Sequence, residues 1–338
     1  MIKKKMARLA NDHLLILIIL SLVTIGTMLS PTFLRVSNLQ NLLFSITVLG
    51  FLALGESLVM LVAEIDLTLG AIIAFAPTAG VWLARKILLF RGSDIVQGGQ
   101  YVTGGLGLSV LFTILVGVLI SLLMGFIITR FNIIALIATL GGMYALGGCV
   151  FLFFNGYSLY FNNLPGTNWL GTAKMAGVPI SFILFLSVGL IIMFFMKYTK
   201  FGRRIYATGG NEKAAIYAGI NIKKWKIIAF AINGFLASIA ALIYTSRLES
   251  IEMTQGSGYE MYAIAIALIA GISMEGGRGT VGDVILASII IGLSFNVMTL
   301  LGLFSWWQTM TIGSIILFAA AQLALSRKSL VKKMNTAG

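Results

Sequence analysis

Residues that build disulfides and metal centres are almost missing from this sequence. Its 338 residues include one cysteine, Cys149, and one histidine, His13. A disulfide framework needs paired cysteines, and a Cys/His metal site needs several grouped ligands, so both are excluded.

Charge is also scarce, because 10% of the residues are charged and 59% are hydrophobic. A soluble globule does not have this composition. Apolar runs of about 18 residues are typical of membrane spans, and they recur from Leu14 to Leu325. The sequence therefore predicts an all-α polytopic membrane protein.

Acidic residues number 11 against 24 basic residues, which gives a formal charge of +13. Such a balance is found in nucleic-acid-binding proteins, but here no soluble basic domain exists to carry that function. Lysines and arginines retained on the cytosolic side of a membrane explain the charge instead. The partner that the charge indicates is the lipid bilayer, and no nucleic acid is expected.

Apolar runs of suitable length predict about ten spans, with Pro77 expected to kink or break the third and with the eighth short for a crossing. Residues 1–30 have the basic and apolar regions of a signal peptide, but the apolar run is as long as a span and no small-x-small cleavage site precedes Pro31, so an uncleaved first span is expected. The ten expected spans are 14–30, 43–63, 67–84, 107–129, 133–153, 180–197, 226–246, 260–274, 281–301 and 307–325.

The distribution of basic residues predicts the orientation. With an even number of spans and a cytosolic amino terminus, 18 of the 24 lysines and arginines fall on inside segments. The positive-inside rule therefore places both termini in the cytosol. The chain divides into a cytosolic tail (1–13), one transmembrane permease domain (14–325) and a second cytosolic tail (326–338), and its longest outer loops are 85–106 and 154–179.

The longest internal cytosolic loop, residues 203–226, reads RRIYATGGNEKAAIYAGINIKKWK. Asn211 has a side chain suited to a helix N-cap, and Glu212 is an acid in the first turn, where the helix dipole favours it. Gly219 can take the left-handed backbone conformation that ends a helix. The seven residues between the caps make a helix of about 10 Å, which is marginal alone and needs a surface to dock on. The alternative is a solvated loop held at lipid headgroups. We expect the docking role to fall on Gly209 and Gly210, which permit a sharp turn into the helix, on the two capping residues with Glu212, and on the small face formed by Ala214, Ala215 and Ala218.

This segment resembles the coupling-helix region of permease subunits from ATP-binding-cassette importers of monosaccharides, of the ribose, galactose and xylose type. The resemblance extends, in the family's order and over about three quarters of the chain, to IDLTLG at 65–70, IATLGGM at 137–143, GYEMYAIAIALIAGISMEGGRGTVGD at 258–283 and WWQTMTIGSIIL near the end. The chain departs from many relatives at Ala63, Glu64, Asn132, Ile133 and Asp283. These departures affect the identity of the sugar and not the family.

The resemblance implies a transport subunit and not an enzyme. It implies a bacterial inner-membrane location, a second permease subunit, identical or closely similar, with the translocation path at or near their interface, and a periplasmic or lipid-anchored sugar-binding protein. It also implies cytosolic ATPase subunits that bind the ATP. No stretch of this chain fits GxxxxGK[ST], and the glycine-rich stretch 276–282 lacks the lysine. The chain therefore carries no cofactor of its own, and hydrolysis belongs to another polypeptide.

Polar residues within the predicted spans are candidates for the substrate path, because burying them in a membrane is costly. Glu56 is the acid that lies well inside a span, and Asn233 and Asn296 are amides inside later spans. Each could bind a sugar hydroxyl, or it could hold helices together. Gln308 is expected to hold helices together, and Asp66 to cap the third span.

Two other classes of function compete with the permease. An ion-coupled secondary transporter usually has several carboxylates near the midplane, whereas Glu56 stands nearly alone. A membrane-embedded enzyme needs a nucleophile, base and orienting group or a set of metal ligands, and the spans supply neither. The ATP-driven permease is the leading hypothesis, and the secondary transporter is the alternative.

Overall fold

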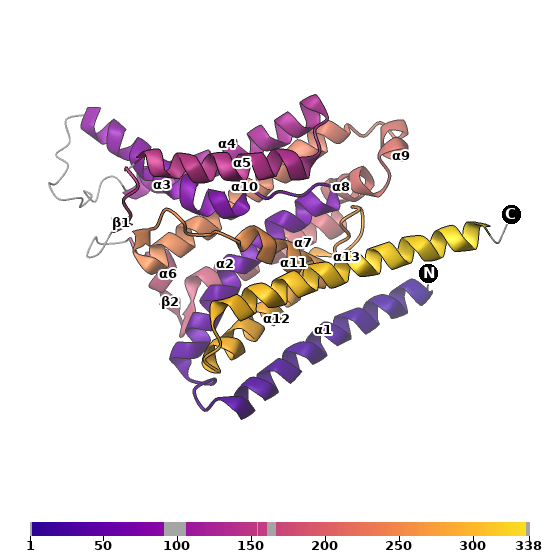
Figure 1. Cartoon of the computed structure of the whole chain (residues 1–338), viewed down its shortest axis with the longest axis horizontal. Helices are drawn as coiled ribbons and strands as arrows, with labels where there is room; N and C mark the ends of the chain where they lie inside the picture. The colour runs from indigo at the N-terminus through magenta and orange to yellow at the C-terminus, as the bar shows by residue number, and fades with distance from the viewer. Residues whose placement is uncertain (1, 91–105, 154, 161–166, 336–338) are drawn as a thin grey trace.

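Helices make up most of the computed structural model, which describes residues 2–90, 106–153, 155–160 and 167–335 (Figure 1). The helices are α1 (Ile2–Leu29), α2 (Val36–Leu61), α3 (Leu69–Phe90), α4 (Leu106–Phe131), α5 (Ala135–Phe153), α6 (Trp169–Thr172), α7 (Ile180–Tyr198), α8 (Lys200–Gly210), α9 (Glu212–Tyr217), α10 (Ile222–Leu248), α11 (Tyr259–Ile269), α12 (Val281–Leu300) and α13 (Ser305–Asn335). Two short antiparallel pairs join β1 (Leu159–Tyr160) to β4 (Ser250–Ile251) and β2 (Lys174–Met175) to β3 (Val178–Pro179). The all-α prediction is confirmed.

Six of the described helices are long and apolar enough to cross a membrane: α2, α4, α5, α7, α10 and α12. This confirms a multi-pass architecture but does not support a count of about ten spans. The eighth expected span, 260–274, corresponds to α11, whose 11 residues cover about 16 Å at 1.5 Å per residue, about half of a hydrocarbon core. The other expected spans lie on α1, α3 and α13, outside the set of six.

Helix α2 forms the centre of the fold. Every residue from Ile46 to Leu61 is buried, as expected for a helix that is apolar on all sides. It packs against α10, α12, α11 and α7. In contrast, only 28%, 17% and 22% of the apolar windows of α4, α5 and α7 are buried. These three helices therefore lie at the periphery, with apolar faces available to lipid or to another subunit.

Pro77 lies inside α3, and the helix continues past it. A proline has no N–H group to donate to the carbonyl four residues earlier, which here belongs to Ile73. The side chain of Gln255 supplies the replacement, since its Nε2 donates to the Ile73 carbonyl at 2.8 Å. The expected break is therefore absent, and the helix instead gains a polar contact with the segment before α11.

The two ends of the molecule differ. The amino-terminal end of α1 and the carboxyl-terminal end of α13 lie at the same end as α8 and α9, and α6, β1 and β2 lie at the opposite end (Figure 1). Helix α6 is held to the end of α10 because Ser246 Oγ accepts from the Gly171 N–H at 3.0 Å and donates to the Thr167 carbonyl at 2.7 Å. The segments expected as tails continue α1 and α13. Residues 91–105 and 161–166 of the expected outer loops lie outside the described residues.

Candidate functional site

Residues 203–226 form three helical pieces: most of α8, all of α9 and the first turn of α10. A side chain caps α9 and α10 at their starts. Asn211 Oδ1 accepts from the Ala214 N–H at 3.0 Å, and Asn221 Oδ1 accepts from the Lys224 N–H at 3.1 Å. Gly219 follows α9 with φ of +75°, a conformation that favours glycine. The predicted start and end of the short helix are therefore confirmed.

Gly209 and Gly210 have a structural role different from the one expected. They form the last turn of α8 and not a turn into α9. A Cβ on Gly209 would overlap the carbonyl oxygen of Leu61 at the end of α2, and one on Gly210 would meet Gly277. The Gly277 N–H donates to the same Leu61 carbonyl at 2.9 Å. Gly209 therefore lets α8 pack closely against the end of α2, whereas a Cβ on Gly210 would make an ordinary contact with the 273–280 turn.

The alanines of α9 do not share one exposed face. Ala215 is 3% exposed and packs inward, whereas Ala214 and Ala218 are exposed. The largest outward-facing groups are Ile216, 61% exposed, and Tyr217, 92% exposed. Sequence reasoning focused on the small residues and missed these two. Two large apolar side chains in an otherwise polar connection were the signal that could have identified them.

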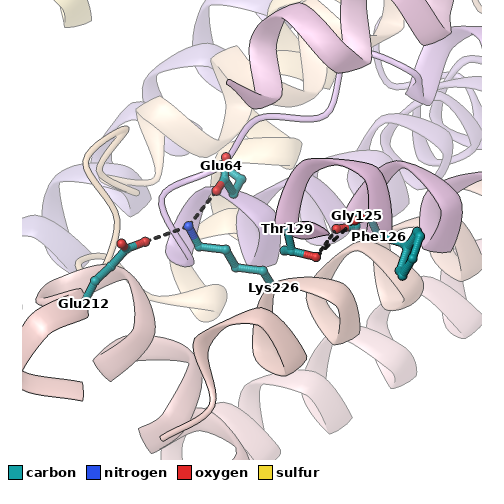
Figure 2. Close-up of polar contacts among 6 residues, drawn as sticks. All are labelled: Glu64, Gly125, Phe126, Thr129, Glu212 and Lys226. Carbon is teal, nitrogen blue, oxygen red and sulfur yellow. Dashed lines mark hydrogen bonds and ion pairs between the residues drawn. The ribbon is translucent and has the colours of Figure 1, made fainter. Parts of the chain in front are cut away.

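Lys226 joins this segment to the centre of the protein (Figure 2). Its Nζ lies 2.7 Å from Glu64 Oε1, in the connection between α2 and α3, and 2.6 Å from Glu212 Oε1, at the start of α9. The side chains of Lys226 and Glu64 are 14% and 13% exposed, and that of Glu212 is 51% exposed. Burial raises the pKa of Glu64, and the contact with Lys226 opposes that rise. One ammonium therefore links three elements.

A cavity of about 680 Å³ lies beside this ion pair, between the end of α4, α9 and the start of α10. Glu64, Glu212 and Lys226 line it together with Thr129, whose Oγ1 donates to the Gly125 carbonyl at 2.7 Å and the Phe126 carbonyl at 3.3 Å (Figure 2). The cavity therefore lies next to the ion pairs of Lys226 with Glu64 and Glu212.

A polar cluster close to Glu64 in the chain is buried between α2, α3 and α10. The Asp66 carboxylate accepts from the Thr68 N–H at 2.9 Å, the Thr68 hydroxyl at 2.5 Å and Asn233 Nδ2 at 3.1 Å. Glu56 Oε1 accepts from the Asp66 N–H at 3.1 Å. Glu56, Asp66 and Asn233 are completely buried. Asp66 holds Thr68, the residue before α3 begins at Leu69, so its capping of the helix itself stays a prediction. Two of the three expected path residues, Glu56 and Asn233, meet here.

Asn296, the third expected path residue, lies elsewhere. Its side-chain amide exchanges hydrogen bonds with Asn38 at 2.8 and 3.0 Å. The pair lines a cavity of about 370 Å³ that also contains Tyr244, Tyr259 and Gln308. Gln308 donates to Thr299 Oγ1 at 3.3 Å. The structure therefore does not bring the three candidates to one place.

Comparison with known proteins decides the family. Residues 38–320 match the model described as the branched-chain amino acid transport system permease component. The chain belongs to this permease family. It is 33% identical to the ribose import permease protein RbsC of Escherichia coli K12, over 89% of the chain and 90% of that protein. It is 34% identical to RbsC of Bacillus subtilis, over 88% of each, and 32% identical to the D-allose transport system permease protein AlsC of E. coli, over 89% and 87%. No solved structure matches the chain.

The permease thus has a line of polar contacts from α9 to the connection between α2 and α3. It runs from Glu212 through Lys226 to Glu64. Asp66 lies two residues further along the chain and accepts from the Thr68 N–H just before α3. No group of three or more metal-ligating side chains is found among the described residues.

Proposed function

We propose that the permease is the membrane subunit of an ATP-binding-cassette importer and that it carries a monosaccharide. The ribose and allose permeases named above, and the L-arabinose ABC transporter permease AraH of Azospirillum brasilense, which is 29% identical over 92% of this chain, support that substrate class. Cytosolic ATPase subunits would supply the energy and bind the ATP. A sugar-binding protein outside the bacterial inner membrane would deliver the solute, and a second permease subunit would complete the path.

The orientation belongs to the same proposal. We place both termini, α8 and α9 in the cytosol, with α1, α3 and α13 crossing the membrane beside the six apolar helices. The segment that contains the short helix α11 makes the tenth crossing, which gives the even number that two cytosolic termini require. The termini and α9 lie at one end of the molecule, as this requires (Figure 1), and basic residues are concentrated in 197–226.

The observation that carries the proposal is the construction of α9. A helix of six residues is not stable alone, yet it is capped at both ends, anchored by the Glu212–Lys226 ion pair and presents Ile216 and Tyr217 outward. Exposed apolar side chains on a helix that is held in place are suited to insertion into a groove of another protein. A movement of that partner would displace α9, and the ion pairs of Lys226 would transmit the displacement to Glu64. We therefore assign α9 as the contact with the ATPase.

The test places a bulky charge on this exposed surface. Tyr217→Arg, Ala218→Arg and Ala214→Arg are expected to leave membrane insertion intact, to abolish ATP-dependent uptake into proteoliposomes and to reduce co-purification of the ATPase. Tyr160→Arg is the matched control, because Tyr160 is also exposed, at 61%, but lies at the opposite end. Ala215→Arg is unsuitable, because Ala215 is buried within the chain.

Unchanged uptake and co-purification in all three variants would contradict the assignment of α9. Sugar uptake driven by an ion gradient without ATP would instead favour the secondary transporter.

A further inference from the structure

A third cavity, of about 430 Å³, lies between the first turns of α3, the middle of α5 and the segment leading into α11. Its lining combines small or apolar residues with hydroxyl, amide and carboxyl groups. The residues that line it are Gly70, Ala71, Ala74, Met143, Tyr144, Gly147, Gly148, Phe151, Met253, Thr254, Gln255, Ser257 and Glu260.

Glu260 is the unusual member of this lining. The residue is 6% exposed, and its Oε2 atom is buried without a hydrogen-bond partner in the described part of the chain. Burial of an unpaired carboxylate oxygen is costly. Glu64 and Asp66, in contrast, have partners. Glu56 Oε2 also has no hydrogen-bond partner among the described residues, but it lies inside the packed centre of α2 with no exposed area. Glu260 thus combines an unpaired oxygen with a cavity that can hold a ligand.

Glu260 packs closely against the start of α3. A Cβ on Gly70 would overlap Glu260 Oε2, so the glycine leaves the room that the carboxylate occupies. Gly256 and Gly258 have φ of +81° and +85°, which allow the tight turn before α11. Gln255 fixes that turn to α3 through the Ile73 carbonyl.

The chemistry of the lining selects one class of solute. Glu260 can accept a hydrogen bond from a hydroxyl group, and Thr254, Ser257 and Tyr144 can donate or accept. Phe151 and Tyr144 add aromatic rings to the lining, a residue type suited to packing against the C–H side of a small sugar ring. Among the residues that the structure describes, the lining contains no lysine or arginine, so a phosphate or carboxylate would meet the charge of Glu260 without compensation.

We propose that this cavity holds the solute during transport and that Glu260 accepts a hydrogen bond from a hydroxyl group of a neutral, unphosphorylated sugar. The inference rests on the proposed function and names the residue that recognises the solute. It differs from the path through Glu56, Asn233 and Asn296 expected from the sequence.

The first experiment compares uptake of D-ribose, D-allose, L-arabinose and their monodeoxy analogues by the complete transporter in proteoliposomes. Glu260→Gln is expected to lower uptake of the transported sugar about tenfold, because the amide oxygen is an uncharged and weaker acceptor than the carboxylate, with unchanged protein in the membrane. One deoxy analogue, lacking the recognised hydroxyl, should be transported equally by both proteins. Glu252→Gln, an exposed acid in the same segment, is the matched control.

The second experiment does not depend on ATP or on the other subunits. Ser257→Cys is introduced into a Cys149→Ser background, and its rate of reaction with a maleimide is measured on the purified permease. We expect the transported sugar to slow labelling, and its phosphorylated form and choline to have no effect. Labelling of the Ser257→Cys variant that is slowed by choline and not by sugar would overturn the proposal in favour of a cationic solute.

The two experiments separate the two hypotheses. If the unmodified transporter imports a sugar, but Glu260→Gln keeps the normal ratios among the analogues, the site is wrong and the function stands. If the unmodified transporter imports none of the sugars and sugars do not slow labelling, both are wrong. Protection by sugar without ATP-dependent uptake would support the site and contradict the ATP-driven function.

Discussion

Lys226 connects residues that are 162 and 14 positions away in the chain, Glu64 and Glu212. Both carboxylates depend on one ammonium, and Glu64 is mostly buried. Breaking a mostly buried ion pair on one side leaves an uncompensated charge, which costs more than the pair contributes. Lys226 is therefore expected to matter more than the exposed lysines beside it.

We predict that Lys226→Met lowers the free energy of unfolding by about 1–3 kcal/mol and that adding Glu64→Gln restores most of the loss. Thermal unfolding of the purified permease measures both effects, and Lys224→Met, at an exposed position in the same turn, is the control. Equal losses in the single and double variants would show that Glu64 is not the group left uncompensated.

The same variant is expected to depend on pH. Burial raises the pKa of Glu64 in the folded protein, and removing Lys226 raises it further. A carboxyl group with a higher pKa in the folded state than in the unfolded state destabilises the fold as it ionises, and this effect grows as the pH rises from the unfolded pKa to the folded pKa. The stability deficit of Lys226→Met should therefore shrink as the pH falls from neutral through the folded pKa. A deficit that is constant with pH would contradict this explanation.

Glu56 accepts the Asp66 N–H through one oxygen, so its contact is to the backbone of the α2–α3 connection. We predict that Glu56→Gln, which retains an acceptor, changes stability little. Glu56→Leu is expected to lower it by about 1–3 kcal/mol, because the buried Asp66 N–H loses its partner. Membrane abundance and uptake should fall together in Glu56→Leu. A change in sugar selectivity at normal abundance would instead place Glu56 on the substrate path.

At the scale of elements, α3 and the segment before α11 are joined by a contact that depends on a proline. Pro77 leaves the Ile73 carbonyl free for Gln255. We predict that Gln255→Ala lowers the free energy of unfolding by about 1–3 kcal/mol in the natural sequence and by clearly less in a Pro77→Ala background, where the residue 77 N–H can bond the carbonyl. The double-mutant cycle measures this coupling. Additive effects would show that the two residues act independently.

At the scale of the whole molecule, the orientation can be tested by accessibility of single cysteines in intact cells. In a Cys149→Ser background, a cysteine in place of Lys213 on α9 is expected to resist a membrane-impermeant maleimide, and one in place of Ser257 is expected to react. Both positions are exposed, so the difference reports the side of the membrane. Labelling of the Lys213 position from outside would reverse the proposed orientation, and reaction after cell lysis confirms that the site is reactive.

The sequence by itself determined the class of protein, most of its helices and the caps of α9. Apolar runs and capping residues act over a few neighbouring positions, so they can be read without knowledge of packing. The resemblance over residues 203–226 also identified the family, because that signal lies in contiguous motifs. Such local patterns reach their limit at α11, where a run of apolar residues predicted a span and the turn at residue 270 ends the helix after 11 residues.

Only the tertiary structure decided which polar groups meet. The sequence does not show which groups Glu56, Glu64 and Glu260 contact. In the described structure, one bonds a backbone N–H, one pairs with Lys226 and one lines a cavity with an unpaired oxygen. These outcomes depend on α10 packing against α2 and on the approach of the turn before α11 to Gly70. Contacts between residues far apart in the chain are set by how whole helices pack, and no local pattern encodes them.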